Sequence, residues 1–322
     1  MTLPDIPILS TAIAVVISWA LYALFCSYIL EAWVQIRADR GRFMKNYMYQ
    51  QLMDKVNGVN WADGIYFHGT IDLLSRDPKK PSNDISPKLF AETLIEVVGS
   101  SHLVQSGIPS FNGPPVAYQS PLLRSFKYAT LILNASDVVS LFRQGMNSAE
   151  VKASKDINGN INEAEINNYL VGYFENWFTE FTQRLTLWYK KKTREALFYL
   201  GVVIAIFINV DSLQLFNFYD NNPKAAADVA RFYKAHPSWG SDTTSNSEPN
   251  HLASTLDSLI KETKLPVGFQ HSVFKDKAFR QYVKSNWWLG ALKFLGILVS
   301  GFAASFGAPF WFELLKKATS KP

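Results

Sequence analysis

The sequence has little cysteine, and this shortage narrows what the protein can be. Its one cysteine, Cys26, excludes an internal disulfide and any cysteine-rich metal site. The five histidines show no metal-ligand spacing and no recognisable pairing with a nucleophile, and no phosphate-binding glycine loop is present. These absences argue against an enzyme, and we expect neither a cofactor nor a metal site.

Charge is also scarce, and where it lies is informative. Charged residues make up 18% of the chain, against about 25% in a typical soluble domain. The net charge of +5 could suggest nucleic acid, but the cations cluster at the ends of three apolar blocks. Cations in such places are topology signals of membrane proteins. The predicted partner is therefore the lipid bilayer and not nucleic acid.

The first apolar block has no charge between residues 8 and 30. That is enough helix to cross a hydrocarbon core of about 30 Å at about 1.5 Å per residue. The alternative is a cleaved signal peptide, which would need a basic start, but residues 1–7 contain no Lys or Arg. Blocks 196–218 and 287–309 are also predicted to span, with a buried soluble helix as the alternative. Lys293, inside the third block, can extend toward the interface beside Trp287 and Trp288.

The cations that flank the blocks predict the orientation. They follow the first block, precede the second and follow the third, and all three clusters fall on one side if the N-terminus is outside and the C-terminus inside. The clusters are Arg37, Arg40, Arg42 and Lys45; Lys190, Lys191, Lys192 and Arg194; and Lys316, Lys317 and Lys321.

This orientation predicts an all-α membrane protein with three transmembrane helices. The first helix lies in residues 1–37, a mainly helical cytoplasmic domain in 38–195, the second span in 196–218, a smaller extracytoplasmic segment in 219–286, the third span in 287–309 and a cytoplasmic tail in 310–322. Apolar residues recur at helical spacing from about residue 162, with no breaker before the second block. This pattern predicts one long helix that continues into the second span.

Polar residues within or beside the spans are candidate sites. An ionisable group in a span requires a polar partner or water, which makes Asp211, with Asn209 beside it, a candidate functional site. The alternative is that Asp211 lies at the interface and is hydrated, and hydration is the reading we expect. Glu31, near the inner end of the first span, is expected to pair with Arg37 or with a lysine before the second span.

The third span has a small residue at every fourth position: Gly296, Ser300, Ala304 and Ala308. Such a repeat drifts only about 40° per step around a helix and therefore defines one face. Small residues let helix backbones approach closely where lipid offers no hydrophobic drive. We expect this face to pack against another helix, and the alternative is contact with lipid.

Residues 154–165 resemble a calcium-binding loop in part, with Gly159 at the sixth position and Glu165 at the twelfth. The first position should be Asp but is Ser154, and Lys155 adds a cation. A glycine turn before a helix with acidic residues in its first turn explains the same pattern. We expect no metal here.

Several stretches resemble a family of uncharacterised bacterial multi-pass inner-membrane proteins. They are WFTEFTQRLTLWYKKKTR (177–194) with NVD (209–211) after it, LPVGF (265–269), GAPFWFELL (307–315) and FHGTIDLLSR (67–76). The chain departs from the family pattern at Thr186, where glycine is usual, and at Phe269, where tryptophan is usual. The resemblance implies a bacterial inner-membrane location and no particular activity.

Together these features predict a non-enzymatic membrane subunit. It would be an anchor or scaffold that forms a homo-oligomer or holds a partner protein of a membrane complex. The alternative is an oligomeric channel or membrane-perturbing effector, which would need a polar stripe along a span. The spans offer only Asn209, Asp211 and the small residues, which favours the anchor.

Overall fold

The computed structural model describes residues 7–75, 80–82, 84–154, 162–235 and 287–319. This part of the chain is almost entirely helical, which confirms the all-α fold class. Its strands β1 (Met53–Asp54) and β2 (Val59–Asn60) form one short antiparallel hairpin. The chain divides into two compact units, which we call unit 1 (Met1–Trp33 with Lys191–Pro322) and unit 2 (Val34–Lys190).

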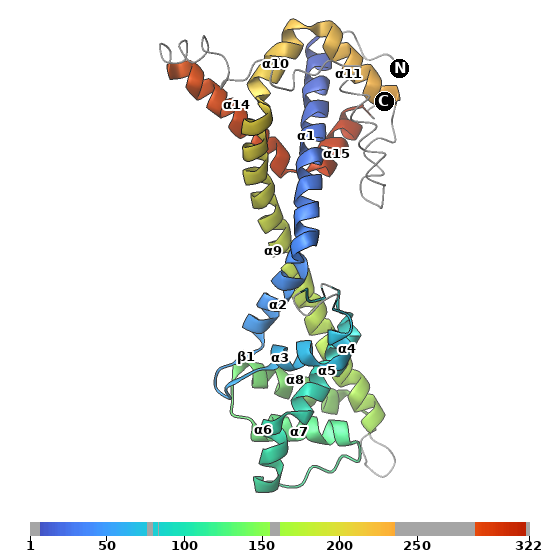
Figure 1. Ribbon diagram of the computed structural model, residues 1–322. Helices are drawn as coiled ribbons and strands as arrows, with labels where there is room; N and C mark the ends of the chain where they lie inside the picture. Colours follow the sequence, from blue (N-terminus) through green and yellow to red (C-terminus); the bar gives the residue numbers. More distant parts are fainter. Residues whose placement is uncertain (1–6, 76–79, 83, 155–161, 236–286, 320–322) are drawn as a thin grey trace. The chain divides into compact units, whose positions relative to one another are not determined.

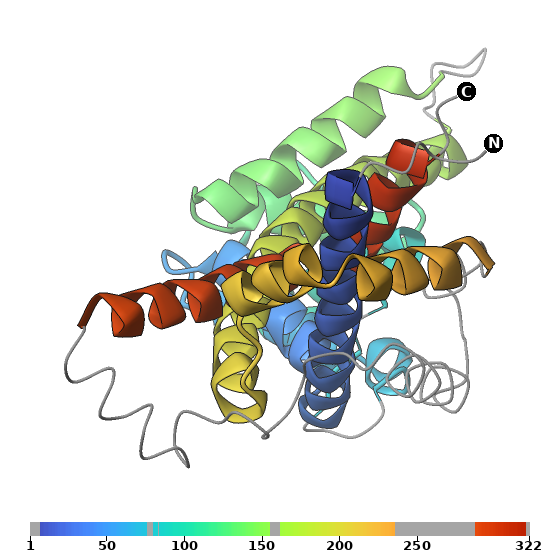
Figure 2. The same ribbon diagram turned by 90° about the horizontal axis from the view of Figure 1, so that it is seen from above.

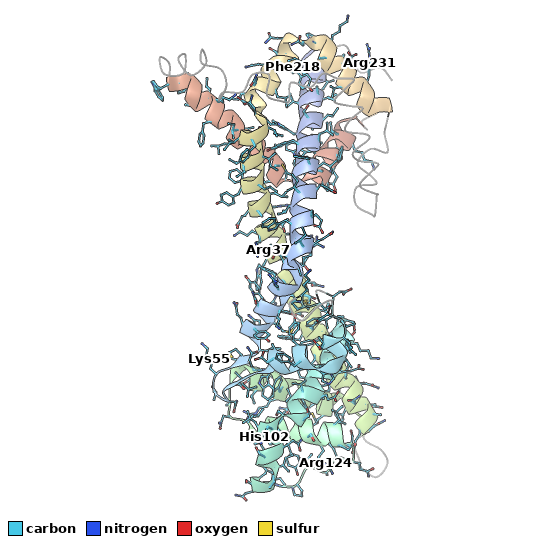
Figure 3. The ribbon with its side chains drawn as sticks, in the orientation of Figure 1. Arg37, Lys55, His102, Arg124, Phe218 and Arg231 are labelled. Atoms are coloured by element: carbon cyan, nitrogen blue, oxygen red, sulfur yellow. The ribbon has the colours of Figure 1, made fainter. Side chains whose placement is uncertain are left out.

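Unit 1 contains most of α1 (Pro7–Arg37), the C-terminal part of α9 (Glu163–Ile208), α10 (Ser212–Asn221), α11 (Pro223–Ala235), α14 (Trp287–Ser305) and α15 (Ala308–Thr319). Helices α1 and α9 run side by side in opposite directions (Figure 1). The Tyr22 hydroxyl donates a hydrogen bond to the carbonyl of Gly201 and fixes their register. Seen from above, α10 and α11 cross over α1 (Figure 2), with Phe218 and Arg231 marking them in Figure 3.

Helix α9 is continuous over 46 residues, which confirms the prediction of one long helix before the second apolar block. The helix does not continue through that block, however. It ends at Ile208, and α10 begins at Ser212 with its axis turned by 58°. The expected unbroken helix over 196–218 is therefore wrong.

The expected helix over 287–309 is interrupted as well. Helix α14 ends at Ser305, and α15 begins at Ala308 at an angle of 86°. Phe306 and Gly307 lie between them, and Gly307 has a φ of 75°, a left-handed conformation that glycine adopts without strain. Among the described helices, one is long and apolar enough to cross a membrane by itself, Ile8–Arg37, and up to three spans result if each bent pair counts as one.

The interior of unit 1 is built around one face of α1. Apolar residues of α1 pack with α10, α11 and α15, and the residues buried there include Ile17, Leu21, Leu215, Val229 and Leu315. The rings of Trp19 and Trp311 lie 5.0 Å apart, and the Trp311 indole donates to the carbonyl of Ala303 at 2.8 Å. The GAPFWFELL stretch thus supplies both the bend after α14 and the apolar face of α15.

Unit 2 is a helical domain with an aromatic core. It contains α2 (Asp39–Gln51), α3 (Trp61–Phe67), α4 (Gly69–Asp72), α5 (Pro87–Ser100), α6 (His102–Gly107), η1 (Ile108–Ser110), α7 (Pro121–Ile132), α8 (Asp137–Lys152) and the start of α9. Phe126, Phe142 and Phe174 are fully buried and meet one another at 5.8–6.2 Å, and Phe90 stacks on Phe178 at 4.1 Å. This core is of the kind that ordinary soluble domains have.

Residues 236–286 lie outside the described residues. They hold most of the expected extracytoplasmic segment, including the LPVGF stretch. Residues 155–161 of the calcium-like loop also lie outside.

Candidate functional site: a buried polar junction in unit 1

The junction begins where α9 stops. Asn209 has a φ of 55°, and the N–H of Val210 donates to the carbonyl of Ala205 at 3.0 Å. A left-handed residue followed by this six-residue closure is the Schellman ending of a helix. Asp211 then caps α10, because its carboxylate accepts from the N–H groups of Leu213 at 2.9 Å and Gln214 at 3.2 Å. Asn209 and Asp211 thus end one helix and start the next.

Asp211 is buried, with 9% of its surface exposed, so the expected hydrated reading is wrong. Besides its two N–H partners, the carboxylate interacts electrostatically with the Lys293 ammonium of α14. Gly296, one turn further along α14, lies directly against the carboxylate, and a Cβ at that position would overlap its oxygen atoms. The missing side chain at Gly296 makes room for the charge.

Hydroxyl groups continue the junction into three helices. The Trp19 indole of α1 donates to the Ser212 hydroxyl of α10 at 3.0 Å, and that hydroxyl lies 2.8 Å from the Ser300 hydroxyl of α14. Ser300 donates to the carbonyl of Val210 at 3.0 Å. Val210 lies between two helices, so its carbonyl has no place in a regular helical ladder. Ser300 thus provides a hydrogen-bond donor for the Val210 carbonyl, which the break between α9 and α10 leaves without a helical partner.

The small residues of α14 pack inside the unit. Gly296, Ser300 and Ala304 are buried against α9 and α10. A Cβ built on Gly201 would lie 2.7 Å from the Ala304 Cβ and 3.2 Å from the Gly301 Cα, so the two helix backbones are in close approach. Ala308 does not belong to this face, because the bend at Gly307 places it on α15, where it is buried with residues of α1.

Glu31 lies apart from the junction, near the other end of α1. The hydrogen bond from Tyr22 to Gly201 places these two residues at the same level of α1 and α9, which are antiparallel (Figure 1). Glu31 lies nine residues after Tyr22 and Lys192 lies nine residues before Gly201, so Glu31 and Lys192 are also at the same level. Glu31 is half-buried. Cys26 is fully buried beside Tyr22.

Sequence reasoning missed several residues of the junction. Gly201 and Ala205 share the four-residue spacing that singled out α14, so the same rule could have found them. Ser212 follows Asp211 directly and carried no separate signal. In the sequence, Trp19 is one more apolar residue of the predicted first span. Only the fold shows that its indole N–H donates a hydrogen bond to Ser212.

Polar groups of unit 2 are held in structural pairs. The Lys127 ammonium lies 2.6 Å from the Glu150 carboxylate, which also accepts from the Tyr118 hydroxyl. Burial, together with that carboxylate, raises the pKa of Tyr118 above its ordinary value. Ser154 donates its backbone N–H and its hydroxyl to Glu165, both at 2.8 Å, and these bonds lower the pKa of Glu165. Within the described residues, no group of three or more His, Cys, Asp or Glu could hold a metal ion.

Comparison of the chain with known protein families, curated proteins and solved structures gives no match.

Proposed function

We propose that the protein is an integral membrane anchor whose unit 1 is embedded in a lipid bilayer and whose unit 2 is a cytoplasmic scaffold for a partner protein or a second copy. The observation that carries this proposal is an inverted distribution of side chains in unit 1. Hydrogen-bonded polar groups, Asp211, Ser212 and Ser300, are buried. Large apolar side chains are exposed on α9 and α14 of the same unit.

The exposed apolar residues follow the helix repeat. On α9, Tyr199 and Phe207 are each 69% exposed, and on α14 Trp287 and Phe294 are 77% and 61% exposed. A soluble domain rarely leaves contiguous aromatic surface in water. In a bilayer the same surface faces hydrocarbon, and the buried polar groups need internal partners such as those of the junction.

The cation clusters support the orientation. Arg37 follows the apolar part of α1, and Lys191 and Arg194 precede the apolar part of α9, so unit 2 is assigned to the cytoplasm. Lys316 and Lys317 are left out of this assignment, because α15 turns by 86° from α14 and packs on the N-terminal half of α1, with Trp311 against Trp19 (Figure 1). The resemblance of the WYKKKTR and GAPFWFELL stretches to bacterial inner-membrane proteins supports that membrane as the location.

A binding role for unit 2 rests on how its polar groups are used. Glu150, Glu163 and Glu165 accept hydrogen bonds from neighbouring side chains or backbone N–H groups, and buried Asp54 accepts from Asn57. These groups serve structure and are not free for chemistry. In unit 1 the hydroxyls bond to one another, which supports an anchor more than an oligomeric channel.

Purification of the full chain in mild detergent tests the proposal. We expect it to resist extraction from membranes by carbonate and to carry a partner protein or a second copy, seen by crosslinking and mass spectrometry. Phe142→Ala, which opens the core of unit 2, should release the partner while the chain stays in the membrane fraction. Leu131→Ala, at a partly exposed position of α7 (45%), is the matched control and should retain it. Extraction by carbonate would refute the anchor, and a monomer without a partner would refute the scaffold.

A further inference from the structure

Two cations on α9 lie one turn apart without a carboxylate between them. Lys191 and Arg194 are both exposed, and neither makes an ion pair with any described residue. Residues three apart on a helix lie on one face with their Cβ atoms about 5–6 Å apart. That spacing allows one phosphate group to accept from both side chains. Lys192 is left out of this pair because it lies level with Glu31.

The position of the pair along α9 fits a headgroup layer. The apolar part of α9 begins at Ala196, two residues after Arg194 and five after Lys191, which corresponds to about 3–8 Å of helix rise. The polar layer on each side of a bilayer is about 5–8 Å thick. The two charges therefore reach the depth at which lipid phosphates lie.

Helix α1 marks the same level independently. The register set by Tyr22 and Gly201 brings Tyr28 level with Glu195 and Trp33 close to the level of Lys191. Tyr28 and Trp33 are each 56% exposed. These two rings span about 8 Å along the helix axis, a depth that matches the polar layer, and exposed aromatic rings in that layer are typical of a membrane interface.

We infer that Lys191 and Arg194 bind the phosphate of an anionic phospholipid headgroup. This inference rests on the proposed membrane location. Anionic lipids are favoured over zwitterionic ones because their phosphate has no cation of its own beside it. Glu195, which is exposed on the same segment, works against this attraction.

Native mass spectrometry of the full chain in detergent, with equal amounts of dioleoylphosphatidylglycerol and dioleoylphosphatidylcholine, tests the inference. The wild type should retain more phosphatidylglycerol, and added NaCl should reduce the preference. Lys191→Gln with Arg194→Gln should lower the preference by about fivefold for each cation removed. Glu195→Gln should raise it, which gives a second readout in a chain that keeps both cations.

Lys55→Gln with Lys152→Gln is the matched control. It removes the same charge from exposed positions of unit 2, where Lys55 is labelled in Figure 3, and should leave the preference unchanged. The inference would be overturned if the wild type showed no preference for phosphatidylglycerol. It would also be overturned if the double variant Lys191→Gln with Arg194→Gln kept the wild-type preference. Failure of the membrane proposal is recognised separately, because the chain would then not float with vesicles of phosphatidylcholine alone.

Discussion

Replacing Gly296 with alanine is expected to destabilise unit 1 by about 1–3 kcal/mol, the usual cost of overpacking. The added methyl group would overlap the Asp211 carboxylate, which must then move. Movement of the carboxylate weakens the hydrogen bonds that it accepts from the N–H groups of Leu213 and Gln214. These bonds are 2.9 Å and 3.2 Å long in the structure. A helix cap of this kind is worth about 0.5–2 kcal/mol, so overlap and cap loss act in the same direction.

A double-mutant cycle separates this contact from general damage to the helix. Asp211→Ala removes the cap and the charge, and in that background Gly296→Ala should cost almost nothing, because the methyl group no longer meets an oxygen. Asp211→Asn keeps a side chain of the same shape that caps as well as Asp. In that background Gly296→Ala should cost about as much as in the wild type. The coupling between positions 296 and 211 is then about 0.5–3 kcal/mol.

The measurement is unfolding of the purified protein in mild detergent, followed by circular dichroism. Gly172→Ala is the control: Gly172 is also helical, and a Cβ there would meet no atom within 4 Å. It should be neutral or stabilising by up to about 1 kcal/mol. Additive effects of Gly296→Ala and Asp211→Ala would refute the reasoning.

Other predictions concern the junction, the core of unit 2 and acid stability. Ser300→Ala removes the bond to the Val210 carbonyl and should cost about 1–2 kcal/mol, whereas Ser305→Ala, at a half-buried site at the end of the same helix, should change stability by less than about 0.5 kcal/mol. Phe142→Ala should cost about 3–5 kcal/mol in denaturant unfolding, because it empties a fully buried site. Bonds from Ser154 lower the pKa of Glu165, so the stability they add is present above the ordinary glutamate pKa and is lost as the pH falls through the lowered value. Glu165→Gln should remove that part of the acid dependence, and an unchanged acid profile would contradict it.

The long helix α9 could be predicted from the sequence because its apolar residues repeat at helical spacing. The break at its end could not be seen in hydropathy, since Ile208, Val210 and Leu213 keep the average high around it. A local signal was nevertheless present. Asn favours the left-handed ending of a helix and Asp favours the start of the next, and here they stand two residues apart.

Only part of the buried polar junction could be predicted from the sequence, because the sequence does not show which residues meet across a contact. Four-residue spacing singled out Gly296, Ser300 and Ala304, but spacing says nothing about the partner across the contact. The overlap of Gly296 with Asp211 and the bond from Ser300 to Val210 join residues far apart in the chain. The same spacing wrongly included Ala308, because the repeat continues through Gly307 while the helix does not.

The measurement that tests the central claim most directly is labelling of single cysteines with a membrane-impermeant maleimide in intact spheroplasts. In a Cys26→Ala background, Lys224→Cys places the thiol at the start of α11 and Lys55→Cys places it in unit 2, both at exposed positions. An embedded unit 1 with unit 2 in the cytoplasm predicts labelling at position 224 in intact spheroplasts and at position 55 only after permeabilisation. Labelling of position 55 without permeabilisation, or of position 224 only after it, would contradict the account.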